Sequence, residues 1–350
     1  MIDTIKLLVP IYDPTLLAKL EGTLVRFRKE DLKTNEIKFE FYSSNVELGS
    51  YHRNVTIKST KVPSGLFIEF SLAKYERGNN VEMIYPHQVV GIVEKLYSEL
   101  CVQVQYELPH FSLWLLYRLD ICYNWLLQSN GDAMHAIDFI KRIDYPRKKK
   151  HVWDTSVMYQ GSAYIVKFYI KGAEFQRHDY NEIKKQDYER AQALAAYAEN
   201  ILRFEVGLKH AYLMEYFGRK NIYLTDIADD NFIQDMLAEY LGKVFHYVNA
   251  KTTTEAEVRR ILAEHFTKTK AMRLYQFYKG FYFDDEMKAM YLAGGLERST
   301  LYRYKKDLKR VGVGFSVGDP VVGAGILEQL IIPSPFTRFA LFDSPATMPV

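Results

Sequence analysis

Cysteine is nearly absent from this sequence, and its scarcity excludes a disulfide-stabilised scaffold. Cys101 and Cys122 are the only two cysteines, and neither stands in a Cys-x-x-Cys or Cys/His spacing typical of a zinc site. We therefore interpret both as small buried hydrophobic residues in a reducing compartment.

Long apolar runs are also missing. The most apolar stretch, residues 111–127, is interrupted by Arg118 and Asp120 and falls short of the roughly 20 residues that span a bilayer. The first residues show no basic segment followed by an apolar one, which is the pattern of a signal peptide. We expect a cytoplasmic protein that does not associate with membranes.

A strong excess of charge of one sign is absent as well. The chain has 46 Lys and Arg against 43 Asp and Glu, so local basic clusters have to decide whether it binds nucleic acid. The Gly-rich stretch 312–325 lacks Gly-x-x-x-x-Gly-Lys, which argues against a nucleotide-binding loop. Aromatic residues are abundant, with 27 Tyr and 21 Phe, and such side chains either fill a core or stack on unpaired bases.

Hydrophobic periodicity predicts an α+β fold with an antiparallel sheet. Strands are predicted over residues 4–9, 37–42, 54–59, 65–72, 116–127, 155–159, 163–171 and 201–209. Helices are predicted over residues 87–107, 132–143 and 181–199. The predicted organisation is a catalytic domain over residues 1–220, a smaller, mainly helical domain over residues 221–311, and an irregular tail over residues 312–350.

Ionisable residues recur on one face of three predicted strands. Each segment alternates ionisable with apolar residues, which places the ionisable ones on one side of the strand. These residues are Arg118 and Asp120, then Lys167, Tyr169 and Lys171, then Arg203 and Glu205. A solvated sheet face with cross-strand ion pairs is one interpretation. A shared functional site is the other, and the repeated pairing of a cation with a carboxylate or a phenol favours it.

If the three strands adjoin, their polar residues form a set suited to phosphodiester chemistry. Two carboxylates, Asp120 and Glu205, can hold Mg²⁺ or Mn²⁺, a hard cation that polarises a phosphoryl oxygen. Tyr169 can attack phosphorus as a phenolate, which forms a phosphotyrosine and releases a 3′-hydroxyl. Lys171 can favour the phenolate or stabilise the charged transition state. We predict Tyr169 and Lys171 as catalytic residues and the two carboxylates as metal ligands.

Several motifs follow one another in an order that resembles a known family. They are Met1-Ile2-Asp3, Arg118-Leu119-Asp120, Tyr169-Ile170-Lys171, Leu202-Arg203-Phe204-Glu205-Val206-Gly207-Leu208-Lys209, Tyr212-Leu213, Phe217-Gly218 and Arg298-Ser299-Thr300-Leu301-Tyr302-Arg303-Tyr304. This ordered set spans most of the chain and resembles the gene II type rolling-circle replication initiators of filamentous phages and, more distantly, plasmid initiators.

The resemblance implies a replication-initiator or relaxase-like nuclease domain that nicks and rejoins DNA at a specific site. Such an enzyme cuts one strand of supercoiled origin DNA, holds single-stranded DNA and stays linked to its 5′ end. A host polymerase, aided by a host helicase, would extend the free 3′ end in the host cytoplasm. The family's Tyr-x-Lys corresponds to Tyr169 and Lys171, and its acidic residues correspond to Asp120 and Glu205.

Two features of the predicted site stay open. Many enzymes of the wider superfamily hold their metal with a His-hydrophobe-His motif, and this sequence has no His-x-His, so the full ligand set is undetermined and Glu174 is a further candidate acid. Some initiators use two tyrosines, and Tyr159 and Tyr164 flank the predicted hairpin turn. Strand parity places Tyr164 on the apolar face and favours Tyr169 as the nucleophile.

Basic residues near the site and in the C-terminal helices are predicted to contact DNA. A basic connection before the hairpin could bind phosphates, and residues 284–310 resemble a helix-turn-helix whose second helix could enter a groove. The predicted DNA-binding residues are Arg118, Lys167, Arg203, Lys148, Lys149, Lys150, Arg298 and Arg303.

Other functions fit parts of this pattern. The chain could be a non-catalytic origin-binding regulator that uses only its C-terminal helices, or an intracellular structural protein. It could also be a hydrolytic, metal-dependent nuclease in which water attacks and Tyr169 only packs. A covalent protein-DNA adduct distinguishes strand transfer from all of these.

Overall fold

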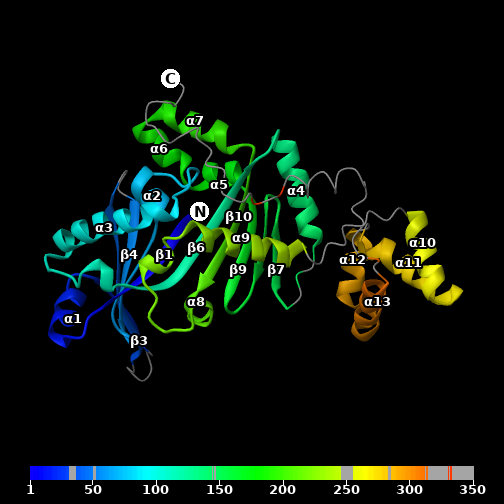
Figure 1. Cartoon of the computed structure of the whole chain (residues 1–350), viewed down its shortest axis with the longest axis horizontal. Coiled ribbons are helices and arrows are strands. Elements are labelled where there is room, and N and C mark those ends of the chain that lie inside the picture. Colours follow the sequence, from blue (N-terminus) through cyan, green and yellow to red (C-terminus); the bar gives the residue numbers. More distant parts are fainter. Residues whose placement is uncertain are drawn as a thin grey trace.

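The chain folds around one large antiparallel sheet (Figure 1). The computed structural model describes residues 1–30, 37–49, 53–143, 145, 147–245, 255–282, 285–311, 313, 330 and 332. Within these residues, ten strands pair in the order β2-β3-β4-β5-β1-β6-β10-β9-β8-β7. The strands are β1 Ile2–Pro10, β2 Val25–Glu30, β3 Ile37–Leu48, β4 Arg53–Lys61, β5 Ser64–Ser71, β6 Leu115–Leu126, β7 Lys149–Trp153, β8 Ser156–Gln160, β9 Tyr164–Ile170 and β10 Ile201–Lys209.

The two faces of the sheet differ because its strands alternate apolar and polar residues. In β9, Val166, Phe168 and Ile170 are buried, whereas Lys167 and Tyr169 remain partly exposed. The strands β5 and β8 follow the same alternation. The buried face carries the main hydrophobic core, and we call the other one the open face.

Helices supply the second layer of the main core. Residues of α3 Val89–Val104, α4 Asn130–Arg142 and α9 Asp230–Phe245 belong to one apolar cluster with the buried face of the sheet. The shorter helices of this region are α1 Pro14–Glu21, α2 Leu72–Arg77, α5 Lys171–His178, α6 Tyr180–Gln186, α7 Tyr188–Ala198 and α8 His210–Phe217. The helices α5, α6 and α7 pack on one another in a cluster of their own, which appears above the sheet in Figure 1.

A second apolar cluster forms from the C-terminal helices. These are α10 Glu255–His265, α11 Lys268–Tyr282, α12 Asp285–Met290 and α13 Arg298–Arg310. Their buried residues include Leu262, Leu274 and Leu308. The domain boundary near residue 220 stays a prediction, and α9 packs with the sheet rather than with this cluster. Most of the predicted tail, residues 312–350, lies outside the described residues.

The predicted α+β class is confirmed, with a large antiparallel sheet and a helical C-terminal region. Two predictions about elements were wrong. The single helix over residues 181–199 is divided, because Asp187 breaks it and caps α7 by accepting a hydrogen bond from the Arg190 amide at 2.9 Å. The basic connection before the hairpin is partly a strand, since β7 begins at Lys149.

No helix among the described residues is long and apolar enough to cross a membrane. The apolar stretch at residues 111–127 is instead mainly β6, which is flanked by β1 and β10 in the middle of the sheet. Both cysteines are free, as expected; Cys122 is buried in this strand, whereas Cys101, which was also predicted to be buried, is only partly so.

Tyr159 illustrates how the core fixes a helix to the sheet. Its side chain is fully buried, and its hydroxyl donates hydrogen bonds to the carbonyl oxygens of Ile140 at 2.8 Å and Ile143 at 3.0 Å. These carbonyls lie at the C-terminal end of α4, where the last carbonyl groups have no following helical turn to supply amide donors. Tyr159 is therefore a structural residue that anchors α4.

We expect Tyr159→Phe to destabilise the protein without changing the arrangement of the polar residues on the open face. Removing the hydroxyl takes a donor from both carbonyls, of which Ile140 still accepts a hydrogen bond from the Ile143 amide, and the loss costs about 1–3 kcal/mol. The free energy of unfolding from urea denaturation measures the loss. A stability equal to that of the unaltered protein would contradict this role for Tyr159.

Candidate active site

The central strands of the sheet bring most of the predicted site residues onto the open face. In the order β6-β10-β9, the register pairs Asp120 with Gly207, Lys167 with Glu205, and Tyr169 with Arg203. Paired residues of adjacent strands share a face. A cleft of about 570 Å³ opens there, and its lining includes Asp120, Lys167, Tyr169 and Glu205.

A glycine makes room for one of the carboxylates. A Cβ atom at Gly207 would lie 2.9 Å from Asp120 Oδ1, closer than real Cβ contacts. The missing side chain on β10 therefore lets the Asp120 carboxylate lie across its neighbouring strand, toward the rest of the site.

Glu205 is the hub of the polar contacts in the cleft. Its Oε1 accepts a hydrogen bond from Lys167 Nζ at 2.5 Å, and its Oε2 accepts one from the Tyr169 hydroxyl at 3.0 Å. Burial disfavours the charged carboxylate, but Lys167, Arg203 and the Tyr169 hydrogen bond together outweigh that effect, and the pKa of Glu205 is lowered. Burial, together with the negative charge of Glu205, raises the pKa of Tyr169 well above its usual value. At neutral pH the site therefore holds a neutral phenol bonded to a carboxylate.

Asp120 is held by an arginine on the same strand. Arg118 donates from Nε to Oδ1 at 2.8 Å and from Nη2 to Oδ2 at 2.6 Å, a bidentate pair. Arg118 also donates to Glu69 at 3.0 Å. Burial and repulsion from Glu205 nevertheless raise the pKa of Asp120 to about 7. The repulsion shows that the two carboxylates share one electrostatic environment.

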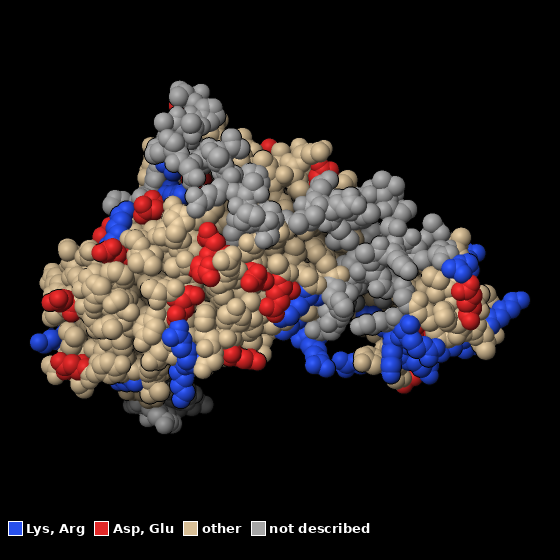
Figure 2. All heavy atoms as spheres, in the orientation of Figure 1, with Lys and Arg blue, Asp and Glu red and all other residues tan. Residues whose placement is uncertain are grey.

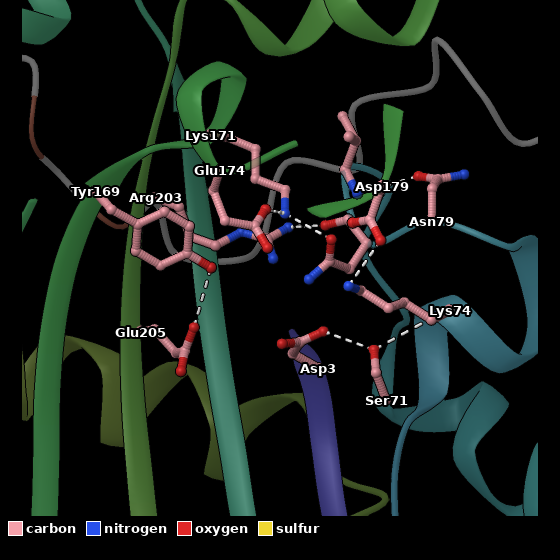
Figure 3. A network of polar contacts seen from close by, with 12 residues as sticks. Asp3, Ser71, Lys74, Asn79, Tyr169, Lys171, Glu174, Asp179, Arg203 and Glu205 are labelled. Carbon is pink, nitrogen blue, oxygen red and sulfur yellow. Dashed lines mark hydrogen bonds and ion pairs between the residues drawn. The ribbon is translucent and has the colours of Figure 1, made fainter. Parts of the chain in front are cut away.

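Lys171 lies in a different place from the one predicted. It is the first residue of α5 rather than part of the strand (Figure 3), and its side chain is fully buried. Its Nζ donates to Asn80 Oδ1 at 2.6 Å and forms an ion pair with Glu174. The same Nζ lies 5.9 Å from the centre of the Tyr169 ring. Burial and nearby Arg203 lower the pKa of Lys171 to about 8.

Arg203 does not present its charge to DNA as predicted. It is fully buried, and its guanidinium donates to Asn124 Oδ1 at 2.7 Å and to the carbonyl oxygen of Asn80. Its position opposite Tyr169 in the register puts a buried cation behind the phenol. The positive charge of Arg203 opposes the rise in the pKa of Tyr169.

Three further residues of the site come from parts of the chain outside the three polar strand segments. Asp3 on β1 lines the cleft, and its Oδ1 accepts a hydrogen bond from Ser71 at 3.0 Å (Figure 3). Glu69 on β5 and Asn80 also line it. The opening Met1-Ile2-Asp3 motif was a signal for Asp3, whereas Glu69 and Asn80 have no distinctive sequence context.

The alternative tyrosines lie outside the cleft. Tyr159 anchors α4, as described above, and Tyr164 packs on the opposite face of β9. The Tyr164 hydroxyl contacts that of Tyr145 at 2.7 Å, and its ring packs edge-on against Tyr240. Of the tyrosines flanking or within the hairpin, Tyr169 alone lines the cleft.

The predicted basic residues are distributed over several surfaces. Lys148 Nζ lies 3.8 Å from the centre of the Tyr164 ring, and Lys150 pairs with Tyr159 in the register. Lys149 pairs with Gln160, on the open face. In α13, Arg298 and Arg303 are exposed, and Figure 2 shows Lys and Arg gathered over the C-terminal helices. A turn at Gly294, with φ of +106°, separates α13 from the helical segment before it.

The carboxylates fit a hard divalent cation in chemistry but not as a complete protein-built cage. Asp120 and Glu205 offer oxygen ligands and repel each other, and a cation would relieve that repulsion. Among the described residues, no group of three or more His, Cys, Asp and Glu side chains is arranged to hold a metal. A metal bound here would take its remaining ligands from water and substrate oxygens, as Mg²⁺ commonly does.

The fold and the cleft define a class: an α+β protein whose single antiparallel sheet displays a tyrosine, two carboxylates and their partner cations on its open face. The family model for the N-terminal region of the phage replication-associated protein of the gene II type matches residues 1–223, which contain all ten strands and the whole cleft. The chain therefore belongs to this family of phage replication initiators, and the resemblance found in its motifs is confirmed. No curated protein and no solved structure matches the chain.

We expect the Asp120 carboxyl to titrate near pH 7 and Glu205→Gln to lower its pKa. The substitution removes the negative charge that repels ionised Asp120. Carboxyl-detected NMR of labelled protein follows the titration. Glu174→Gln serves as the control, because Glu174 lines the same cleft and is not among the main causes of the Asp120 shift. An Asp120 pKa that stays unchanged in Glu205→Gln would show that the two groups are independent.

Proposed function

We propose that this chain initiates rolling-circle replication by nicking and rejoining origin DNA through a 5′-phosphotyrosine at Tyr169. The observation that carries the proposal is the hydrogen bond from the Tyr169 hydroxyl to Glu205, in a cleft that also holds Asp120. A nucleophile bonded to a carboxylate and surrounded by cations is an arrangement suited to attack on a phosphodiester. Membership of a replication initiator family supports the same reaction.

The bond changes balance without an external reagent. Tyr169 Oη attacks phosphorus, the bond from phosphorus to the 3′-oxygen breaks, and the 5′ side of the nick becomes linked to the protein. The phenol proton passes along the existing hydrogen bond to Glu205 Oε2, and the departing 3′-oxygen takes up a proton to become a hydroxyl. Attack by a 3′-hydroxyl on the phosphotyrosine reverses these steps and rejoins the strand.

The cofactor we propose is Mg²⁺ or Mn²⁺, held by Asp120 and Glu205. When bound, it would polarise a non-bridging phosphoryl oxygen and neutralise charge that develops during transfer. Lys167 is placed to compensate the same charge, since its ammonium lies beside Glu205 at the open side of the cleft.

Lys171 and Arg203 act from behind the nucleophile. Both are fully buried near Tyr169, so they do not touch the DNA backbone. Their positive charges favour the phenolate electrostatically, and the paired carboxylate of Glu174 holds the Lys171 side chain in place. We therefore assign Lys171 to positioning and charge stabilisation rather than to direct contact with substrate.

The proposed partners are supercoiled origin DNA and the single strand exposed in it. The cleft would hold the strand to be cut, and the exposed cations of α13, Arg298 and Arg303, would contact duplex phosphates. A host helicase and polymerase would act on the free 3′ end.

Hydrolysis by water is the second candidate, and one observation favours it. The raised pKa of Tyr169 leaves the phenol protonated and weakly nucleophilic until substrate or metal binds. In that case DNA would be nicked without becoming linked to the protein.

We expect the unaltered protein to form a covalent adduct with the supercoiled DNA of its own replicon in the presence of Mg²⁺, and Tyr169→Phe to form none. Denaturing gels detect the adduct and the nick separately. Tyr164→Phe is the matched control, because this tyrosine lies on the same strand but on the buried face. Nicking by Tyr169→Phe at the unaltered rate would favour hydrolysis, and no nicking with any metal would favour a binding protein.

The nicking rate should rise with pH around neutrality. Asp120 must be ionised to hold a cation, and its pKa is about 7, so activity increases as pH rises through that value. Saturating Mg²⁺ should move the midpoint to lower pH, because the metal competes with the proton. Because the pKa of Asp120 is raised in the folded protein, its protonated form adds to the free energy of unfolding at low pH. This contribution is lost as pH rises through about 7. Single-turnover rates between about pH 6 and about pH 8 test the activity profile, and a flat profile would rule out a role for Asp120 ionisation.

A further inference from the structure

The edge strand β7 is in register with the catalytic strands. Along one row of the sheet, Trp153 pairs with Ser156, Ser156 pairs with Tyr169, and Tyr169 pairs with Arg203. Side chains in such a row lie on the same face, so Trp153 is on the open face, two strands away from the nucleophile. At the usual strand spacing this separation is about 10 Å.

Trp153 is unusual among the tryptophans of this chain. Trp114 and Trp125 are buried, whereas Trp153 is 52% exposed. It lines the same cleft as Tyr169. So exposed an indole gains little from burial in the fold, and its large flat surface at the edge of a polar cleft is free to contact a ligand.

A second ring extends this aromatic surface. His151, also in β7, lies with its ring centre 5.9 Å from that of Trp153 and nearly parallel to it, at 12°. The exposed residues Arg177 and His178, at the end of α5, line the same cleft. The surface thus combines flat rings with a cation, which is the composition of sites that stack bases and attract phosphates.

We propose that Trp153, extended by His151, is a stacking platform for an unpaired base close to the scissile phosphodiester. This proposal rests on the proposed nicking function and specifies how its cleft holds the substrate. A separation of about 10 Å corresponds to a base within about three nucleotides of the cut, at a rise of about 3.4 Å per nucleotide. An indole face can cover only a base that has left the duplex, so the ligand at this position is single-stranded DNA.

Base stacking can be separated from phosphate binding with two probes of equal charge. One is a single-stranded oligothymidylate of about 20 nucleotides, and the other is an abasic strand of the same length. We expect the unaltered protein to prefer the strand with bases by roughly 5- to 150-fold, the range for loss of one stacked base. Trp153→Ala should abolish this preference and leave abasic binding unchanged, and Trp153→Phe should restore part of it.

Val152→Ala is the matched control. Val152 is the neighbouring residue of β7, is 51% exposed, and pairs with buried Val157, away from the open face. It should keep the preference for bases. Tryptophan fluorescence gives a second readout, because Trp153 is the exposed tryptophan and its emission should be quenched by the oligothymidylate and not by the abasic strand.

The outcomes also separate this proposal from the nicking function. A base preference that depends on Trp153 supports the platform even if no covalent adduct forms. Adduct formation together with an unchanged preference in Trp153→Ala would overturn the platform and leave the nicking function intact. A dimer that Trp153→Ala disperses, without any base preference, would assign the surface to a second copy of the chain and overturn the proposal.

Discussion

A carboxylate buried on a central strand needs partners that compensate its charge. The partners of Glu205 are the polar residues of β9, so this one interaction arranges the site. One of its oxygens binds the Lys167 ammonium and the other binds the Tyr169 hydroxyl, so a single carboxylate holds both polar side chains of β9. Removing one partner of a buried pair leaves an unpaired charge, which is strongly unfavourable. The hydrogen bond to Glu205 therefore helps to hold the Tyr169 hydroxyl in the cleft.

The sheet makes this arrangement possible because one face packs against helices and the other carries the polar residues of the site. One face binds α3, α4 and α9 through an apolar core, which keeps the strands in register. The open face can then carry polar residues without loss of the fold. The helix α5 begins directly after β9, contributes Glu174 to the cleft and places buried Lys171 in an ion pair with this residue. Two buried cations, Lys171 and Arg203, thus adjoin the phenol of Tyr169, which the proposed reaction would convert to an anion.

Much of this could be predicted from the sequence. Strand alternation correctly brought Asp120, Tyr169 and Glu205 to one face, because side-chain direction in a strand follows from position alone. Their strands also adjoin as supposed. The assignment of catalytic and metal-binding roles to these residues stays a proposal.

Other features depended on information that local patterns do not contain. Lys171 continues the alternation of β9 but begins a helix, and nothing in the residues around it marks the change. Arg203 has the sequence pattern of a surface cation, yet Asn80 and Asn124, remote in sequence, bury and bind it. The row that links Trp153 to Tyr169 is a matter of strand order and register, which no single segment specifies.

The most direct test of the central claim is to identify the residue that becomes linked to DNA. The adduct formed with replicon DNA and Mg²⁺ would be digested with nuclease and protease, and the peptide carrying residual nucleotide would be sequenced by mass spectrometry. The structure predicts a nucleotide attached through its 5′-phosphate to Tyr169. Attachment to another residue, or nicked DNA with no modified peptide, would contradict the account.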